Sequence, residues 1–235
     1  MGRAFEFRRA RKEKRWDKMS KMFTRIGREI AISVKQSGPD PTTNGRLRVA
    51  IQNAKGANMP KDKVESAIKR ASSREASDFQ ELTYEGYGPH GVAIVVECAT
   101  DNPTRTVANV RSFLTRAGGS LGTSGSLDFM FDRKGVFKIA PDGVNLEELE
   151  LELIDYGADD IQPEEEAIYI YTQFSDFGAM NKALEERGVN VISAEFQRIP
   201  TTTVQLTEEQ EEAVMTLIDK LEEDDDVQAV YHTVA

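Results

Sequence analysis

The first third of the chain has the spacing of amphipathic helices. Over residues 17–36, apolar side chains recur at steps of three and four positions, which predicts one helix with a single buried stripe. The glycine and two prolines of segment 37–41 interrupt this pattern. The same spacing predicts a second helix over residues 47–54 and a third over residues 60–71, where proline suits the first helical position. The sequence therefore predicts a small helical bundle in this region.

Beyond residue 78, short apolar runs typical of strands alternate with helical segments. Residues 92–98 are almost continuously apolar and predict a central strand. Asn102 is a suitable N-cap for a helix that ends at Gly118-Gly119, and residues 127–131 predict a second strand. This part of the chain therefore reads as a strand–helix–strand segment.

The C-terminal segment repeats this alternation. Residues 201–206 and 227–234 are rich in valine and threonine, which predicts two strands. Between them, Thr207 and Gln210 have the spacing of a capping box, so a helix is predicted to begin there. We expect the two strand–helix–strand segments to combine into one βαββαβ unit.

The middle of the chain predicts a complete unit of the same kind. Its predicted strands cover residues 135–139, 158–163, 167–172 and 191–198, and its helices cover 145–156 and 176–187. This order, βαββαβ, is the ferredoxin-like arrangement. The predicted fold class is α+β, with an N-terminal helical bundle followed by a split ferredoxin-like α/β domain and a second ferredoxin-like α/β domain inserted in it. The predicted domains are 1–78, 79–133 plus 200–235, and 134–199.

Charge is divided between the two parts of the sequence. Residues 1–78 hold 20 Lys and Arg against 9 Asp and Glu, a net charge of +11. Residues 79–235 hold 10 against 31, a net charge of −21, which gives −10 for the whole chain. Such asymmetry indicates contact with a polyanion or a membrane. Because no apolar stretch is long enough for a signal peptide or a membrane span, we expect a cytoplasmic protein that binds nucleic acid and no membrane.

The candidate nucleic-acid-binding residues are the cations of the predicted N-terminal helices. Many of those on the first helix recur at helical spacing and would form a basic ridge, which the shorter helices extend. Lys and Arg gain binding energy from phosphates by releasing condensed counterions. The candidates are Arg8, Arg9, Arg11, Lys12, Lys14, Arg15, Lys18, Lys21, Arg25, Arg28, Arg46, Arg48, Lys55, Lys61, Lys69 and Arg70.

The sequence carries no signature of an enzyme, a cofactor site or a metal site. The glycine-rich segment 118–125 lacks the Lys-Ser/Thr ending of a phosphate loop and follows a helix, so we interpret it as a helix stop with a tight turn. The acidic run 222–226 lacks the spacing of a calcium-binding loop and is interpreted as a solvated turn. His90 is interpreted as a turn residue, and Cys98, the single cysteine, as a buried structural thiol.

Several segments, in this order along the chain, resemble the YebC/PmpR family. They are Phe23-Thr-Arg-Ile-Gly-Arg-Glu-Ile30, Asn58-Met-Pro-Lys-Asp62, Tyr84-Glu-Gly-Tyr-Gly-Pro-His-Gly-Val92, Thr100-Asp-Asn102 with Arg105-Thr106, and Gly118-Gly-Ser-Leu-Gly122. The resemblance spans most of the chain and implies three domains. Bacterial members are described as "probable transcriptional regulators" that bind DNA and have been tied to the ribosome, while the mitochondrial relative activates translation. The usual Gly-His-Ser-Lys-Trp opening of the family is absent from this chain.

Two functions therefore remain open. One is a DNA-binding transcriptional regulator, and the other is a ribosome-associated translation factor that binds ribosomal RNA through the basic N-terminal domain. A weaker third is a scaffold whose acidic domains bind basic proteins. No recognition helix stands out from the other basic helices, and arginine-rich segments suit folded RNA as well as duplex DNA. We predict a non-enzymatic nucleic-acid-binding regulator of gene expression.

Overall fold

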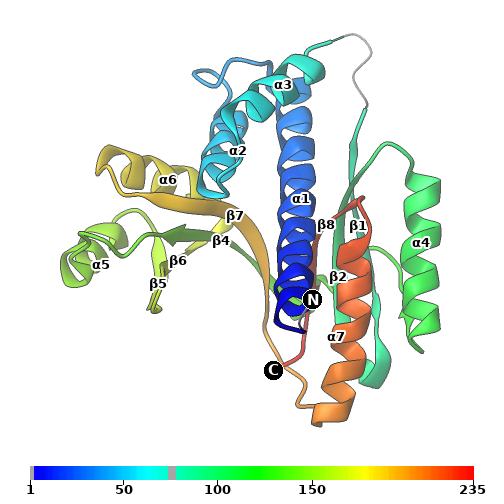
Figure 1. The fold of residues 1–235 in the computed structure, drawn as a ribbon. Coiled ribbons are helices and arrows are strands. Elements are labelled where there is room, and N and C mark those ends of the chain that lie inside the picture. Colours follow the sequence, from blue (N-terminus) through cyan, green and yellow to red (C-terminus); the bar gives the residue numbers. More distant parts are fainter. Residues whose placement is uncertain (1–2, 74–77) are drawn as a thin grey trace.

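Three helices form the N-terminal part of the molecule (Figure 1). The structure, a computed structural model, describes the backbone of residues 3–73 and 78–235 and the side chains of residues 18–73 and 78–235. The helices are α1 (Arg3–Ser37), α2 (Gly45–Gly56) and α3 (Lys61–Ala71). Their buried stripes meet in one core of Ile30, Val34, Leu47, Ala50, Ala54, Val64 and Ala71. The predicted bundle and its breaks are confirmed.

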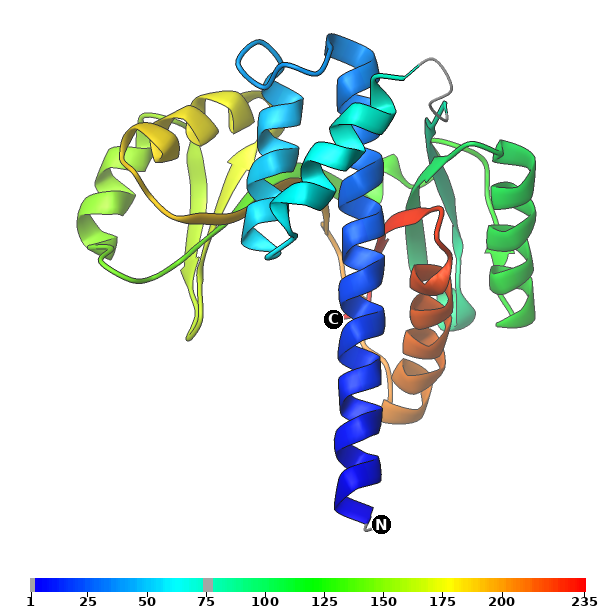
Figure 2. The same cartoon turned by 45° about the horizontal axis from the view of Figure 1, so that its top comes forward.

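The long helix α1 is anchored through its C-terminal half. Ile30 and Val34 pack on α2 and α3 and are buried, whereas Met19 and Met22, further towards the N-terminus, are 40% and 47% exposed. Figure 2 shows the N-terminal end of α1 projecting away from the other elements. One helix therefore provides both a packing surface and an extended arm.

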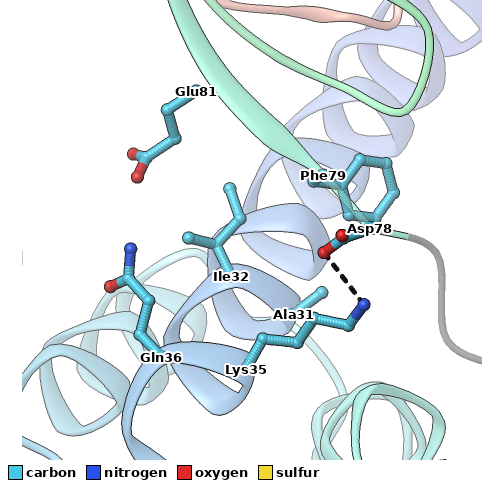
Figure 3. A pocket seen from close by; sticks show the side chains of 7 residues that line it. All are labelled: Ala31, Ile32, Lys35, Gln36, Asp78, Phe79 and Glu81. Atoms are coloured by element: carbon cyan, nitrogen blue, oxygen red, sulfur yellow. Dashed lines mark hydrogen bonds and ion pairs between the residues drawn. The ribbon is translucent and has the colours of Figure 1, made fainter. Parts of the chain in front are cut away.

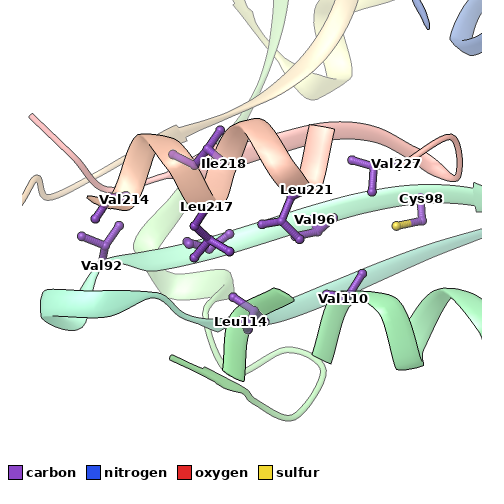
Figure 4. Close-up of a cluster of buried hydrophobic side chains, with 11 residues drawn as sticks. Val92, Val96, Cys98, Val110, Leu114, Val214, Leu217, Ile218, Leu221 and Val227 are labelled. Carbon is purple, nitrogen blue, oxygen red and sulfur yellow. The ribbon is translucent and has the colours of Figure 1, made fainter. Parts of the chain in front are cut away.

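The outer lobe, residues 78–130 and 201–235, is built on a four-stranded antiparallel sheet. Its strands are β1 (Gln80–Tyr87), β2 (Ala93–Thr100), β3 (Ser120–Leu121) and β8 (Val227–His232), in the order β3-β1-β2-β8. Helices α4 (Pro103–Arg116) and α7 (Glu208–Glu223) cover one face and bury Val96, Leu114 and Leu217 with their neighbours (Figure 4). Asn102 caps α4 and Thr207 with Gln210 forms the capping box of α7, as predicted.

The inserted lobe, residues 131–200, has the predicted βαββαβ order. Its elements are β4 (Phe131–Ile139), α5 (Leu146–Ile154), β5 (Ala158–Pro163), β6 (Ile168–Gln173), α6 (Phe177–Glu186) and β7 (Val191–Pro200). The antiparallel strand order β5-β6-β4-β7 is that of a ferredoxin-like sheet. The α+β fold class, with N-terminal helices and two antiparallel sheets, is confirmed.

Four strand assignments of the outer lobe differ from the sequence prediction, so its order is β1-β2-α4-β3-α7-β8 and the predicted split βαββαβ unit is wrong. The short strand β3 lies in the segment that was predicted as a turn. Strand β1 was not predicted, because its sequence Gln80-Glu-Leu-Thr-Tyr-Glu-Gly-Tyr87 is mostly polar. Residues 127–131 are not a strand, since Asp128–Met130 forms a 3-10 turn and Phe131 begins β4. Residues 201–206 are not a strand either, and Val204 makes only an isolated bridge to Val234. Valine and threonine favour a strand, but these residues lack a partner strand along their length.

Two glycine segments from the quoted motifs meet where β3 pairs with β1. A Cβ atom on Gly119 would lie 2.1 Å from the carbonyl oxygen of Tyr87, and one on Gly86 would lie 2.4 Å from that of Ser120. No larger residue fits without moving the backbone. The predicted helix stop is also present, because Gly118 has a φ of +83° immediately after α4. These glycines are thus explained by packing.

Side chains join the three parts of the molecule. Asn53 of α2 donates to the carbonyl of Ala194 and accepts from its N–H, both at 2.8 Å, and so satisfies the free edge of β7. Arg198 of β7 pairs with Glu97 of β2 at 2.9 Å. Tyr231 of β8 donates to the carbonyl of Phe196 at 3.1 Å. The lobes and the bundle are held together by specific contacts.

Candidate nucleic-acid interface

The projecting arm of α1 carries the densest positive charge in the sequence. Residues 3–28 hold eleven Lys and Arg against three acids. The predicted residues Arg8, Arg9, Arg11, Lys12, Lys14 and Arg15 lie on this helix, but their side chains fall outside those that the structure describes. Lys18 and Lys21 are the next two candidates, and neither forms an ion pair with a described residue. The backbone of this part of α1 projects away from the other elements (Figure 2).

The shorter helices contribute a second group of available cations. Arg48, Lys55, Lys69 and Arg70 are exposed and form no ion pair with any described side chain. Lys61 is paired with Glu65 at 3.6 Å, but both side chains are largely exposed. Such a pair contributes about 0.2–1 kcal/mol, so a phosphate can displace it. These five predicted residues remain available to a polyanion.

Arg46, by contrast, is fully occupied within the protein. It pairs with both carboxylate oxygens of Glu29 on α1 and with both of Glu81 on β1, at 2.6–3.0 Å. Its fifth N–H bonds the side-chain oxygen of Gln36 at 2.9 Å. Burial opposes the charged guanidinium, but the hydrogen bonds to Glu81 and Glu29 outweigh it and raise the pKa of Arg46. Arg46 therefore connects the bundle to the outer lobe and has no donor left for phosphate.

Arg28 is engaged in a second contact between α1 and the outer lobe. It donates to the carbonyl of Ala99 at 2.6 Å and to Asp226 at 3.0 Å, and its guanidinium lies over the ring of Phe79. One turn earlier, Arg25 donates to the carbonyl of Glu222 at 3.1 Å. The sequence placed Arg25, Arg28 and Arg46 on an exposed basic surface, whereas the structure uses them to hold the helices in place.

Asp226 is the centre of this contact, and its position corrects one sequence interpretation. The acidic run 222–226 was expected to be a solvated turn, but Asp226 is only 2% exposed. It accepts hydrogen bonds from Arg28, Arg105, Thr106 and Thr100. Burial alone would raise the pKa of this carboxyl, but these donors, Arg105 first, hold its pKa below the usual value. The motif Thr100-Asp-Asn with Arg105-Thr106 therefore serves to bind this carboxylate.

The glycine-rich loop after α4 is organised by another buried carboxylate. Glu85, 4% exposed, accepts hydrogen bonds from the backbone N–H of Gly125 at 2.8 Å and of Leu127 at 2.6 Å. In a phosphate loop, such N–H groups would face the anion. Here a carboxylate already occupies them. The structure thus supports the interpretation of this segment as a structural turn.

The other groups singled out in the sequence, Cys98 and His90, occupy structural positions. Cys98 is buried, and its burial raises the pKa of the thiol to about 12, so it is an unreactive structural thiol. His90 is exposed in the turn between β1 and β2 with a φ of +61°. Within residues 18–73 and 78–235, no group of three or more His, Cys, Asp or Glu side chains is arranged to hold a metal ion. None of the described helices combines the length and apolar character needed to cross a membrane.

A shallow hollow lies between α1 and the start of β1 (Figure 3). Lys35 and Asp78 pair across it at 3.0 Å, and Glu81 reaches Arg46. Ile32 and Phe79 supply its apolar part. Because its charged groups pair with one another or with Arg46, this hollow belongs to the contact between the bundle and the outer lobe.

Comparison with known proteins assigns the family. A model of the "TACO1/YebC protein N-terminal domain" matches residues 3–74, and a model of the "TACO1/YebC second and third domain" matches residues 79–234. The chain belongs to the TACO1/YebC family. The resemblance noted in the sequence is therefore confirmed, and the two matches together span nearly the whole chain.

Relatives in the family share the full length of this chain. A protein of Cytophaga hutchinsonii is 58% identical, and one of Flavobacterium johnsoniae is 56% identical, each over 100% of this chain and 99% of its own. Both are named "Probable transcriptional regulatory protein". The crystal structure of the conserved hypothetical protein Aq1575 from Aquifex aeolicus matches with a TM-score of 0.82 at 41% identity, over 92% of this chain and 90% of that one.

Proposed function

We propose that this protein is a non-enzymatic regulator of gene expression that binds nucleic acid through the cations of α1, α2 and α3. One observation carries the proposal: the bundle separates its basic residues into two sets. The first set, Arg46 and Arg28, forms ion pairs with acidic groups of the protein. The second set has no partner among the described side chains and consists of Arg48, Lys55, Lys69 and Arg70. Together with Lys18, Lys21 and Lys61, they add to the positive charge of α1. Unpaired cations gathered in one basic domain are the electrostatic footprint of phosphate binding.

Transcriptional regulation through DNA is the form that the names of the relatives support. Those relatives are 56–58% identical over the whole chain and are named for transcription. A helix as long as α1, with its basic end projecting, has the reach to follow a groove or a phosphate backbone (Figure 2). We propose duplex DNA as the first target to test.

Ribosomal RNA is the second candidate, and the fixed position of the acidic lobes favours it. Residues 79–235 carry a net charge of −21, and Arg46, Arg28 and Asn53 hold them against the basic bundle. Naked DNA would be repelled by these lobes, because they cannot move far from the cations. On a ribosome, basic proteins lie beside the RNA and would complement the acidic surface.

The test measures binding of the full chain to promoter-length duplex DNA and to ribosomes at equal, near-physiological salt. The test variant replaces Arg48, Lys55, Lys69 and Arg70 by Ala. Its matched control replaces the exposed lobe cations Arg111, Arg116, Lys182 and Lys220 by Ala, which removes the same charge elsewhere.

If the proposal is correct, the bundle variant loses at least tenfold in affinity, about 1.4 kcal/mol. The lobe variant keeps its affinity or loses only slightly, because the lobes become more negative but do not contact the nucleic acid. Equal losses in the two variants would mean that the bundle is not the binding surface. Co-sedimentation with ribosomes that excess promoter DNA does not reverse would select the ribosomal target. Tight, sequence-selective DNA binding without ribosome association would select transcription.

A further inference from the structure

The sheet of the inserted lobe has one face that its helices do not cover. Phe137 and Ile139 of β4 and Ile168 and Ile170 of β6 are buried in the core with α5 and α6. Because side chains alternate along a strand, the residues between and beside them point to the opposite face. Cross-strand pairs place Val136 beside Tyr171 and Lys138 beside Tyr169 on that face. Strand β6, one of the two central strands, therefore carries two tyrosines two residues apart on this face.

We call this surface the tyrosine face and define it by Lys138, Tyr169, Tyr171, Asp160 and Glu195; Val136, on the same side of the sheet, is buried. Asp160 lies opposite Tyr171, and Glu195 lies opposite Val136. Both tyrosines are half-buried, and neither phenol forms a hydrogen bond within the described part of the chain. The Nζ of Lys138 lies 5.4 Å from the centroid of the Tyr169 ring, whereas no described cation lies over the ring of Tyr171. The ring of Tyr171 and both hydroxyls are thus available to a ligand that lies across the strands.

The surroundings of the tyrosine face are acidic. The turn between β5 and β6 holds Glu164, Glu165 and Glu166, all exposed, and it encloses a shallow hollow together with Lys138 and Tyr169. The nearby cation Lys134 is neutralised by Asp159 at 2.6 Å. Over residues 134–199, five Lys and Arg stand against fifteen Asp and Glu, a net charge of −10. Burial raises the pKa of Tyr171, and the negative charges of Asp160 and Glu164 raise it further. This direction is consistent with the acidic surroundings of the ring.

The choice of ligand follows from this charge. Exposed aromatic residues on the central strands of a four-stranded ferredoxin-like sheet can stack unpaired RNA bases. Such stacking brings phosphates alongside the sheet, and here Asp160, Glu195 and the glutamate turn would repel them. Lysine and arginine side chains fit better, because their stems pack on the rings, their charges attract the ring faces and the carboxylates accept their N–H groups.

We propose that the tyrosine face and the adjoining glutamate turn form a binding site for a lysine- and arginine-rich segment of another protein. Tyr169 and Tyr171 supply the surface on which the cationic side chains lie, and the carboxylates of Asp160, Glu195 and residues 164–166 pair with them. The site is separate from the basic bundle, so it does not depend on nucleic-acid binding. It would allow the molecule to contact nucleic acid and a basic protein at once.

The experiment measures fluorescence anisotropy of a labelled peptide of alternating Arg and Gly, titrated with the full chain. Labelled oligouridine is the second probe. One variant carries Tyr169→Ala and Tyr171→Ala, and a milder one carries the corresponding changes to Phe, which keep the rings. A third carries Glu164→Gln, Glu165→Gln and Glu166→Gln. Its matched control carries Glu147→Gln, Glu148→Gln and Glu150→Gln, which removes three exposed charges from α5 of the same lobe.

The peptide affinity should fall about fivefold to thirtyfold when both rings are removed, as expected for two exposed cation–π contacts. It should stay within twofold of the original in the Phe variant. The turn variant should weaken binding clearly more than the α5 control. Equal losses in these two would show attraction to the whole acidic lobe and overturn the site. Absence of peptide binding to the full chain would also overturn the proposal. If the Ala variant lost only its binding to oligouridine, the tyrosine face would bind RNA and not a basic protein segment.

Discussion

Arg28 of α1 lies 3.0 Å from the buried carboxylate of Asp226, 198 residues further along the chain. The same carboxylate accepts from Arg105, Thr106 and Thr100, so a single acidic group ties the basic helix to the outer lobe. A buried carboxylate that keeps its charge must be fully compensated by hydrogen bonds and positive charge. The direction in which the basic arm projects therefore depends on a residue of the acidic lobe.

Replacement of Asp226 by Asn should destabilise the protein strongly. The amide has nearly the same shape but leaves Arg28 and Arg105 without their counter-charge, and breaking a buried pair from one side costs about 3 kcal/mol. Urea unfolding of the full chain measures this difference. The control is Asp225→Asn, next in sequence but not part of the network, which should change the free energy of unfolding by less than about 0.5 kcal/mol. Equal effects of the two changes would contradict the role given to Asp226.

Stability should also fall in acid, through Asp226 and Glu81. Burial would raise the pKa of Asp226, but its hydrogen bonds, chiefly that from Arg105, lower this pKa in the folded protein. The hydrogen bond from Arg46 likewise outweighs burial and lowers the pKa of Glu81. Their contribution is fully present above the unfolded pKa of about 4 and is lost as the pH falls through the lower folded pKa. Unfolding free energies measured from pH 6 down to pH 3 should therefore decline. The Asp226→Asn variant should show a shallower decline over the same range, and an unchanged slope would count against this assignment.

Arg46 and Arg48 lie two residues apart on α2 and should respond oppositely to the same substitution. Arg46→Ala removes the pairs with Glu29 and Glu81, so it should lower the free energy of unfolding. Solvent reaches both carboxylates, which limits the loss to about 1 kcal/mol. Arg48→Ala should leave stability unchanged and reduce nucleic-acid affinity, because Arg48 is exposed and unpaired among the described residues. Urea unfolding and an anisotropy titration with labelled nucleic acid, done on both variants, separate the two roles.

The sequence predicted the elements with strong local signals and missed what depends on distant partners. The capping residues Asn102 and Thr207 act within four residues of their own position, so their role can be read from the sequence. Strand β1 is mostly polar and is stabilised by pairing with β2 and β3, so its pattern of apolar residues did not predict a strand. Arg46 looked like any surface cation, because nothing near it in sequence reveals that Glu81 lies within 2.6 Å. Long-range ion pairs of this kind leave no local pattern.

Gly56 and Gly27 provide a matched pair for the contact between the bundle and the inserted lobe. A Cβ atom on Gly56 would lie 1.8 Å from the carbonyl oxygen of Ile192, whereas one on Gly27 would meet nothing within 4 Å. Gly56→Ala should push α2 away from β7 and destabilise the protein by about 1–3 kcal/mol. Gly27→Ala lies inside α1 and should stabilise it by about 0.5–1 kcal/mol. Thermal or urea unfolding checks both signs, and destabilisation by Gly27→Ala would contradict the open surroundings of that residue.

The salt dependence of nucleic-acid binding tests the arm itself. If Arg11, Lys12, Lys14 and Arg15 each contact a phosphate, replacing all four by Ala should reduce the slope of log affinity against log salt by about 3.6 on duplex DNA, or about 2.8 on a single strand. The matched variant with Arg111, Arg116, Lys182 and Lys220 changed to Ala has the same net charge as the arm variant. It should nevertheless retain the slope of the original protein. Affinities at a series of salt concentrations, with two unrelated sequences, provide both slopes. A slope that is unchanged while the preference between the two sequences disappears would show that these residues read bases instead of holding the backbone.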